Sequence, residues 1–312
     1  MNSTQLRTPQ SHRSLNPLAL ILLCIAMLNS LTAHSLHAAD PLPSGTVQIE
    51  KGIAYLGADR AELADLYLPP TAPPGELRPG IVIIHGGGWT GGRRDANREI
   101  NIGTTLAEHG YVCLSIDYLL QSEDPAAPKI WPRNLHDCKT AVRWLRANAA
   151  RYQIDTDHIG VIGGSAGGHL AAMVGLTGSE LDPPSPYADQ STRVQAVVDM
   201  YGPMAHNRSQ IDRLVDPANP DVETLAKQIT PLSHIDAGDP PILILHGTAD
   251  TTVDVADSEL FAAALAKGNV PHELVIIPDA PHTFHLQPKQ RDLRPVVLGF
   301  FDKYLKPTQP AK

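Results

Sequence analysis

The chain has 312 residues, of which 42% are hydrophobic and 19% are charged, and its formal net charge is -8. This balance is too apolar for a disordered chain, and 28 Pro and 24 Gly interrupt any long coiled coil. The acidic excess argues against a face that binds nucleic acid. Three Cys provide neither a disulfide framework nor a Cys-x-x-Cys metal pair.

The first 39 residues have the pattern of a targeting segment. Arg7 and Arg13 come before any acidic residue, and residues 17–28 (PLALILLCIAML) form an apolar run followed by small residues. The run is shorter than the roughly 20 residues that span a bilayer. The pattern predicts a secretory signal peptide over 1–39, with an uncleaved anchor as the alternative. The mature chain, 40–312, is then expected outside the cell or in the periplasm, without stable membrane insertion.

The mature chain alternates strand and helix signals. Strands are expected at 46–56, 62–68, 81–84, 111–116, 159–162, 194–200, 242–245 and 273–277, and helices at 97–109, 133–151, 166–176, 258–267 and 291–305. The first two strands form an antiparallel pair, and the order of the rest predicts one α/β domain. Its sheet is mostly parallel, with eight strands and helices on both faces. Segments 178–192 and 202–240 carry no clear signal. Both are expected as loops or short helices above the sheet, and the second could also fold over the site as a lid.

A candidate nucleophile lies where a predicted strand meets a predicted helix. Residues 163–167 (GGSAG) fit Gly-x-Ser-x-Gly. A sharp turn from strand to helix needs small neighbours and exposes the serine hydroxyl at the carboxyl end of the sheet. The alternatives are a glycine-rich helix start or a phosphate loop, but no Lys follows the glycines. Ser165 is therefore the predicted nucleophile.

A serine nucleophile needs a base to take its proton and an acid to orient that base. On this type of turn the expected chain order is Ser, acid, His. Asp250 and His282 each follow a predicted strand and lie in that order after Ser165. The rivals are Asp254 and Asp199 for the acid, and His285 for the base.

A third motif, residues 85–89 (HGGGW), follows the strand at 81–84. Attack on a carbonyl creates an oxyanion, which backbone N–H groups can stabilise when no side chain intervenes. The N–H of Ala166, directly after the nucleophile, would complete such an oxyanion hole. The alternative is a tight turn without this role. Trp89 is predicted either to line the substrate pocket or to cover the sheet.

Together these motifs resemble the α/β-hydrolase fold, over about residues 45–306. The chain is most similar to carboxylesterases with a His-Gly-Gly-Gly box, of the feruloyl/acetylxylan-esterase-like (BD-FAE-like) and hormone-sensitive-lipase-like branches. The resemblance implies a triad of Ser165, Asp250 and His282. It also implies that Gly87 and Gly88 join Ala166 in the oxyanion hole.

The chain departs from these esterases at two positions. Leu119 stands after Asp117-Tyr118, where an Arg that braces the structure is usual. Asp254 stands where a Pro is common. The first departure leaves the chemistry intact but puts the local bracing in doubt.

The sequence therefore predicts a serine carboxylesterase for short acyl esters, with acetyl or feruloyl esters on plant polysaccharide as its targets. The expected partner is a small ester or an acylated glycan, and the oligomeric state stays open. No cofactor is expected, and no metal, because the 14 His show no ligand spacing. Cys113 and Cys138 are expected to be buried free thiols. The alternatives are an arylformamidase-like amide hydrolase, a lipase-like esterase for longer acyl chains, and a binding module without catalysis.

Overall fold

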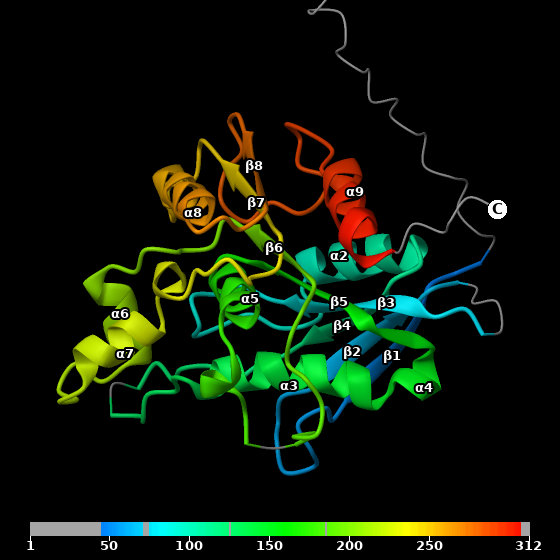
Figure 1. Cartoon of the computed structure of the whole chain (residues 1–312). Helices are drawn as coiled ribbons and strands as arrows, with labels where there is room; N and C mark the ends of the chain where they lie inside the picture. The colour runs from blue at the N-terminus through cyan, green and yellow to red at the C-terminus, as the bar shows by residue number, and fades with distance from the viewer. Residues whose placement is uncertain (1–44, 71–74, 125, 185, 307–312) are drawn as a thin grey trace, which may run out of the picture. The chain divides into compact units, whose positions relative to one another are not determined.

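The computed structural model describes residues 45–70, 75–124, 126–184 and 186–306, so the signal peptide predicted over 1–39 lies outside the described residues. In the described part of the chain, eight strands form one sheet in the order β1-β2-β4-β3-β5-β6-β7-β8 (Figure 1). The strands are β1 (Gln48–Ile53), β2 (Ala64–Leu68), β3 (Arg78–Ile84), β4 (Val112–Ile116), β5 (Ile154–Gly164), β6 (Ala196–Met200), β7 (Ile242–Gly247) and β8 (His272–Ile277).

The helices follow the strands in alternation. The α-helices are α2 (Asn97–Glu108), α3 (Arg133–Ala147), α4 (Ala149–Tyr152), α5 (Ala166–Leu176), α6 (Arg208–Leu214), α7 (Val222–Gln228), α8 (Val255–Lys267) and α9 (Arg294–Leu305), and the short 3-10 helices are η1 (Ser179–Leu181) and η2 (Pro231–Ser233). β1 pairs with β2 and β2 with β4 in antiparallel fashion, and the remaining pairs are parallel. The mostly parallel eight-stranded sheet that the sequence predicts is confirmed.

Successive side chains of a strand point to opposite faces, and β3 shows how the sheet uses both. Val82 and Ile84 belong to the core shared with α3, α5 and α8. Ile81 and Ile83 belong to a second core, shared with α2 and α9. Figure 1 shows the two groups of helices on opposite sides of the sheet. With both faces covered, the central strands carry apolar side chains on both faces, as residues 81–84 of β3 show.

The position of the site follows from the strand order. β3 lies between β4 and β5, and the chain leaves β3 toward β4 but leaves β5 toward β6. The connections therefore diverge at the carboxyl ends of β3 and β5. In open α/β sheets this divergence creates the crevice in which ligands bind.

The bracing at Leu119 comes from another residue. Arg60, between β1 and β2, donates two hydrogen bonds to Asp137 of α3, at 3.0 and 2.7 Å. The N–H of Leu119 donates to the same carboxylate at 2.8 Å. A guanidinium far from residue 119 in the chain thus holds the segment that follows β4.

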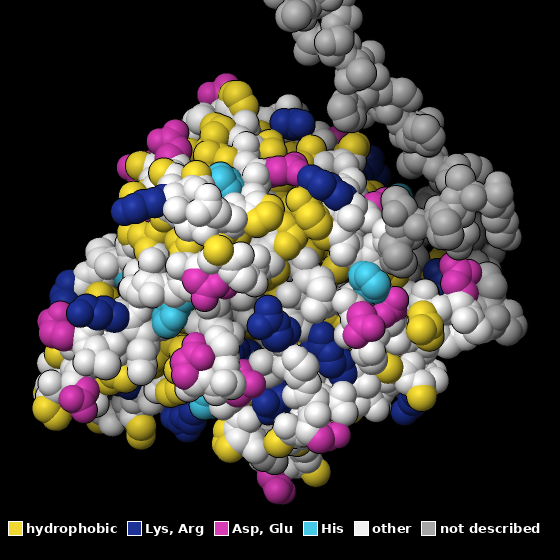
Figure 2. Space-filling model, viewed as in Figure 1, with side chains coloured by type: hydrophobic (Ala, Val, Ile, Leu, Met, Phe, Trp, Pro, Cys, Tyr) yellow, Lys and Arg dark blue, Asp and Glu magenta, His cyan; other side chains and the backbone are white. Residues whose placement is uncertain are grey.

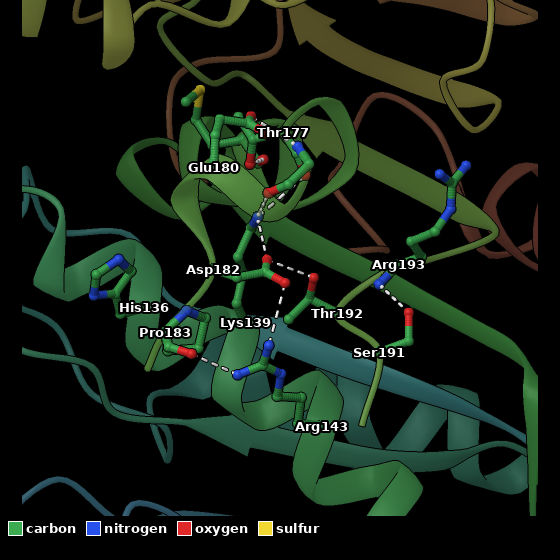
Figure 3. A network of polar contacts seen from close by, with 12 residues as sticks. His136, Lys139, Arg143, Thr177, Glu180, Asp182, Pro183, Ser191, Thr192 and Arg193 are labelled. Atoms are coloured by element: carbon green, nitrogen blue, oxygen red, sulfur yellow. Dashed lines mark hydrogen bonds and ion pairs between the residues drawn. The ribbon is translucent and has the colours of Figure 1, made fainter. Parts of the chain in front are cut away.

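A polar cluster ties the connection after α5 to α3 (Figure 3). The Lys139 side chain is 0% exposed, and its ammonium donates to the carbonyls of Thr177 and Gly178 and to Asp182. Arg143 donates to the other oxygen of Asp182. This connection, which has no clear signal in the sequence, is therefore held by the hydrogen bonds of Lys139 and Arg143 to Asp182 and to backbone carbonyls.

Three further features bear on the sequence expectations: the cysteines, the length of the helices and the charges at the surface. Cys113 and Cys138 are buried and free, as predicted. None of the helices in the described ranges is long and apolar enough to cross a bilayer. Figure 2 shows acidic and basic side chains interspersed on the face that it presents.

Candidate active site

Ser165 occupies a sharp turn between β5 and α5. Its backbone has φ 57° and ψ -123°, a left-handed conformation that non-glycine residues adopt only under strain. The turn is closed so tightly that a Cβ on Gly163 would lie 2.1 Å from the carbonyl oxygen of Gly167. The glycines around Ser165 therefore make the turn possible, and the turn presents the hydroxyl at the carboxyl end of the sheet.

The structure brings the three predicted triad residues together. The Ser165 hydroxyl lies 2.9 Å from Nε2 of His282, and Nδ1 of His282 lies 2.6 Å from Oδ2 of Asp250. Since Asp250 accepts from Nδ1–H, Nε2 is free to accept the serine proton. The geometry is that of a nucleophile, a base and an orienting acid.

The second oxygen of Asp250 is held by the backbone. Its Oδ1 accepts from the N–H groups of Thr252 and Val253, at 2.8 and 2.9 Å. Burial by itself raises the pKa of Asp250, but the hydrogen bonds from His282, Val253 and Thr252 outweigh burial and hold its pKa below the ordinary value. Asp250 is thus a fixed anion at neutral pH, suited to stabilise an imidazolium at His282.

The rival residues serve other purposes. Asp254 is exposed and caps α8 by accepting from the N–H of Ala256. Asp199 accepts from the N–H of Gly202, and burial raises its pKa to about 8, so it is neutral at pH 7. His285 is exposed, and its Nδ1 accepts from the N–H of Gln287.

The loop after β3 approaches Ser165 from the neighbouring strand. Gly87 has φ 116° and Gly88 has φ 60°, both left-handed. The Gly87 carbonyl accepts from the N–H groups of Thr90 and Gly91, which fixes the turn. Among the described residues, the N–H groups of Gly87, Gly88 and Ala166 have no acceptor. Free donors of this kind suit a developing oxyanion.

A cavity of about 440 Å³ opens beside Ser165 and His282. Besides these two residues and the glycine loop, its lining includes Arg93, Arg98, Thr252 and Thr283. Trp89 is not part of that lining. Its ring is 2% exposed, and its indole N–H donates to Nδ1 of His169 at 3.2 Å. Of the two roles predicted for Trp89, this placement favours packing behind the loop over contact with substrate.

Sequence reasoning missed residues that brace the site. Tyr201, directly after β6, places its ring 4.8 Å from that of His282 and donates its hydroxyl hydrogen to the Phe284 carbonyl. Arg98 of α2 donates to the Tyr201 oxygen at 3.0 Å. His246, at the end of β7, lies 3.2 Å from Oδ2 of Asp250. None of these three residues belongs to a motif described above, and their contacts join segments that are distant in the sequence, so no local pattern identifies them.

The described residues contain no group of three or more His, Cys, Asp or Glu side chains arranged to hold a metal ion. The sheet order, the serine turn after β5 and the loop after β3 define an α/β-hydrolase fold.

The comparison with protein families gives the same result in more detail. The BD-FAE family model matches residues 64–265, which is more than half of the chain. The chain belongs to the BD-FAE family.

Several known relatives of this chain carry esterase names. Esterase LipQ of Mycobacterium tuberculosis is 32% identical over 251 residues, covering 75% of this chain and 57% of LipQ. The chain thus spans little more than half the length of this curated relative.

This chain also resembles solved structures of esterases and covers almost their whole length. A carbohydrate esterase from gut microbiota has a TM-score of 0.72 at 26% identity, covering 85% of this chain and 98% of that one. Esterase 2 of Thermogutta terrifontis, phosphorylated by paraoxon, has a TM-score of 0.67 at 29% identity, covering 86% of this chain and 98% of that one.

Proposed function

We propose that the protein is a carboxylic ester hydrolase in which Ser165 is the nucleophile, His282 the base and Asp250 the orienting acid. The observation that carries the proposal is the continuous hydrogen-bonded line from Ser165 through His282 to Asp250. The esterase names of the relatives support the reaction class.

In the first step Ser165 attacks the ester carbonyl while Nε2 of His282 takes the hydroxyl proton. The carbonyl oxygen becomes an oxyanion, which accepts from the N–H groups of Gly87, Gly88 and Ala166. His282 then gives its proton to the leaving alcohol, and the acyl group stays on Ser165.

In the second step water replaces the alcohol. His282 takes one proton from the water, and the hydroxyl attacks the acyl carbon. The bond to Ser165 breaks, the proton returns to its oxygen, and the acid leaves. The reaction consumes one water per ester and needs no cofactor.

We further propose short acyl esters as substrates, with acetyl or feruloyl esters on plant polysaccharide as the natural targets. Among the described residues before β3 there are only β1 and β2 as regular elements, so no helical cap is built there. The similarity to a carbohydrate esterase supports a glycan-linked alcohol. A lipase-like preference is the second candidate, because α6 from segment 202–240 contacts the glycine loop through Arg213.

The test uses the full chain and a series of 4-nitrophenyl esters from two to twelve carbons, alongside acetylated and feruloylated xylan. We expect maximal turnover at two to four carbons and release of acetate from xylan. Stoichiometric labelling by paraoxon, located by peptide mass spectrometry at Ser165 and lost in Ser165→Ala, is expected as well. Maximal turnover at eight carbons or more without acetate release would favour the lipase-like candidate, and labelling at another residue would refute the nucleophile.

We also propose that the protein is exported after removal of residues 1–39. The sequence pattern of that segment is the only support for this proposal. N-terminal sequencing of protein from the native host is expected to find a start near residue 40. An intact Met1 in the soluble cytoplasmic fraction would contradict it.

A further inference from the structure

A second cavity adjoins the catalytic cavity at Thr252. It has a volume of about 340 Å³ and is lined by side chains from two segments, 205–210 and 252–260. Thr252 lines this cavity and also the cavity beside Ser165 and His282. We refer to the second cavity as the Thr252 side cavity. The mechanism proposed above does not use it.

The Thr252 side cavity opens next to the base of the triad. The N–H of Thr252 donates to Asp250 at 2.8 Å, and the other oxygen of Asp250 accepts from His282 at 2.6 Å. His282 has to lie against the alcohol oxygen of the ester in order to give it a proton. A group attached to that alcohol can therefore continue past Thr252 into the side cavity.

Hydrogen bonds hold the two walls of the side cavity together. The carboxylate of Asp257, in α8, accepts from the N–H groups of Met204 and Ala205 at 3.2 and 3.0 Å. These bonds tie the segment that leads into α6 to the helix that supplies the opposite wall. The side cavity is therefore a built feature of the fold, and its shape does not depend on a ligand.

Two amide side chains line the side cavity, and their oxygens are already bound. Oδ1 of Asn207 accepts from the N–H of Gln210 at 3.1 Å, and Oε1 of Gln210 accepts from the N–H of Asn207 at 2.9 Å. Both NH2 groups are left without an acceptor among the described residues. Because Asn207 is exposed and Gln210 only half-buried, a ligand in the side cavity can reach these donors.

The charge of the lining argues against an ionic ligand. The lining contains no Lys or Arg, and its two carboxylates, Asp254 and Asp257, form no ion pair within the described residues, so an anion would be repelled. A cation would find little attraction at Asp257, because both of its oxygens accept from the backbone and burial raises its pKa. The ligand that suits this lining is neutral and polar.

One apolar side chain adds to these polar groups. Leu260 of α8 is 50% exposed and lines the side cavity. A sugar ring carries C–H groups on its faces and hydroxyl groups at its edge, so it needs an apolar contact and hydrogen bonds together. Leu260 supplies the apolar contact, and Asn207, Gln210 and the Thr252 hydroxyl supply the hydrogen bonds. An alkyl chain would leave the amide donors without an acceptor.

We propose that the Thr252 side cavity is a subsite for the sugar unit next to the acylated one, so that the preferred substrate is an ester on an oligosaccharide and not on a single sugar. This inference rests on the proposed ester hydrolysis and assigns a binding site to its alcohol. The acylated sugar lies beside Ser165, and its neighbour contacts Gln210 and Leu260. Only the ester bond breaks, one water is consumed, and the bond between the two sugars stays intact.

The test compares a monoacetylated methyl xyloside with the two methyl xylobiosides that carry one acetyl group on either sugar, at the same hydroxyl. For the full-length wild type we expect kcat/KM for at least one xylobioside to exceed that for the xyloside about tenfold, because the second sugar adds hydrogen bonds and an apolar contact. Values for both xylobiosides that do not exceed that for the xyloside would overturn the inference.

Two variants test whether the preference arises in the side cavity. Gln210→Glu keeps the oxygen that accepts from Asn207 but removes the amide donors, and it should lower the xylobioside-to-xyloside ratio of kcat/KM about threefold or more. Leu260→Gln removes the apolar contact and should lower the same ratio to a similar extent.

The matched control is Glu259→Gln, at the neighbouring exposed position of α8 and outside the lining of the side cavity. It should leave the ratio within about twofold of the wild-type value, as is usual for a surface substitution. An equal ratio in the wild type, Gln210→Glu and Leu260→Gln would contradict the assignment of the subsite.

Binding separates this inference from the proposed reaction. Calorimetry on full-length Ser165→Ala, with xylotriose that carries no acetyl group as the probe, is expected to detect binding that weakens when Leu260→Gln is added. If no ester is hydrolysed but xylotriose still binds through Leu260, the proposed function fails and the subsite stands. If esters are hydrolysed and neither the ratio nor the binding depends on Gln210 or Leu260, the proposed function stands and the subsite fails.

Discussion

Two regions of this molecule concentrate polar side chains, and they differ in what those side chains leave unsatisfied. Around Lys139 every ammonium hydrogen has an acceptor, and Asp182 is shared between Lys139, Arg143 and Thr192. Around Ser165 the strained backbone presents a hydroxyl, and the N–H groups of Gly87, Gly88 and Ala166 have no acceptor among the described residues.

This comparison separates polar groups that stabilise the fold from polar groups that are free to bind a ligand. A closed network such as that of Lys139 is complete without any outside molecule, so its value lies in stability. An open network adds no such stabilisation, because its free donors have no hydrogen-bond partner within the described residues. Mutations in the two regions should therefore change different quantities.

The largest effect is expected at the open site. Ser165→Ala should lower turnover by a factor on the order of 10⁴–10⁶, because the triad residues act as a unit. Its melting temperature should stay close to that of wild type, since the hydroxyl contributes little to packing. Esterase assays and thermal unfolding on the same preparation check both parts. Substantial residual activity in a folded Ser165→Ala would contradict the role of this residue.

The acid gives the next largest effect and offers a matched pair. Asp250→Asn should reduce kcat by about 10⁴, because the amide no longer fixes the required tautomer of His282. Asp254→Asn keeps a capping side chain at the start of α8 and should retain nearly full activity. Steady-state kinetics on both variants test which aspartate is the acid of the triad. Equal losses of kcat in the two variants would show that sequence order alone does not identify the acid.

The closed region should respond in stability instead. Lys139→Met leaves Asp182 and two carbonyls without their ammonium donor and should lower the free energy of unfolding by about 3 kcal/mol. The kcat of the molecules that remain folded should be unchanged. Urea unfolding measures the loss, and Lys267→Met, at an exposed position of α8, serves as the control with little expected change. A loss of kcat without a loss of stability would contradict the structural role assigned to the Lys139 cluster.

A smaller effect is the different pH dependence that two carboxylates, Asp182 and Asp199, give to the free energy of unfolding. The hydrogen bond to Lys139 and its other partners outweigh burial and hold the pKa of Asp182 below the ordinary value, whereas burial raises the pKa of Asp199 to about 8. Folded Asp199 keeps a proton that the unfolded chain releases near pH 4. Between about pH 4 and pH 8 this group therefore makes the free energy of unfolding fall as pH rises, by at most about 1.4 kcal/mol per pH unit.

Asp199→Asn removes that contribution and should flatten the decline in unfolding free energy between pH 5 and pH 8. Asp182→Asn should act in the opposite range, since a lowered pKa contributes stability that disappears as pH falls below about 4. Unfolding curves at several pH values measure both slopes. An unchanged slope in Asp199→Asn would mean that the group is ionised in the folded protein.

The sequence predicts the sheet well because its signals are local. Apolar runs mark the strands, and glycines mark the turn at Ser165, so order and type of the elements follow directly. β5 nevertheless begins at Ile154 rather than 159, because residues 155–158 are polar and at least partly exposed and therefore interrupt the apolar pattern. Segment 202–240 contains short helices, as one of the alternatives expected, but their bounds could not be predicted because α6 and α7 are only 7 residues each, too short for a periodic signal.

The candidate site likewise contains some residues that the sequence predicts and others that it does not. Ser165, Asp250 and His282 are found by motif and order, and the structure brings them within hydrogen-bond distance. The Arg98–Tyr201 contact and the placement of Arg213 on Gly88 depend on residues far apart in the chain. Such pairings arise only when the sheet assembles, so no pattern in one sequence reveals them.

The backbone of Ser165 has a consequence for how this protein can change over generations. Its φ of 57° is easily adopted by glycine but strained for serine. Ser165→Gly therefore relieves strain, and the simplest loss of the nucleophile yields a sturdier fold. Selection for stability alone would favour this substitution, so Ser165 is retained only while its hydroxyl is needed for the reaction. A descendant that no longer needed the reaction could lose the serine and keep the fold.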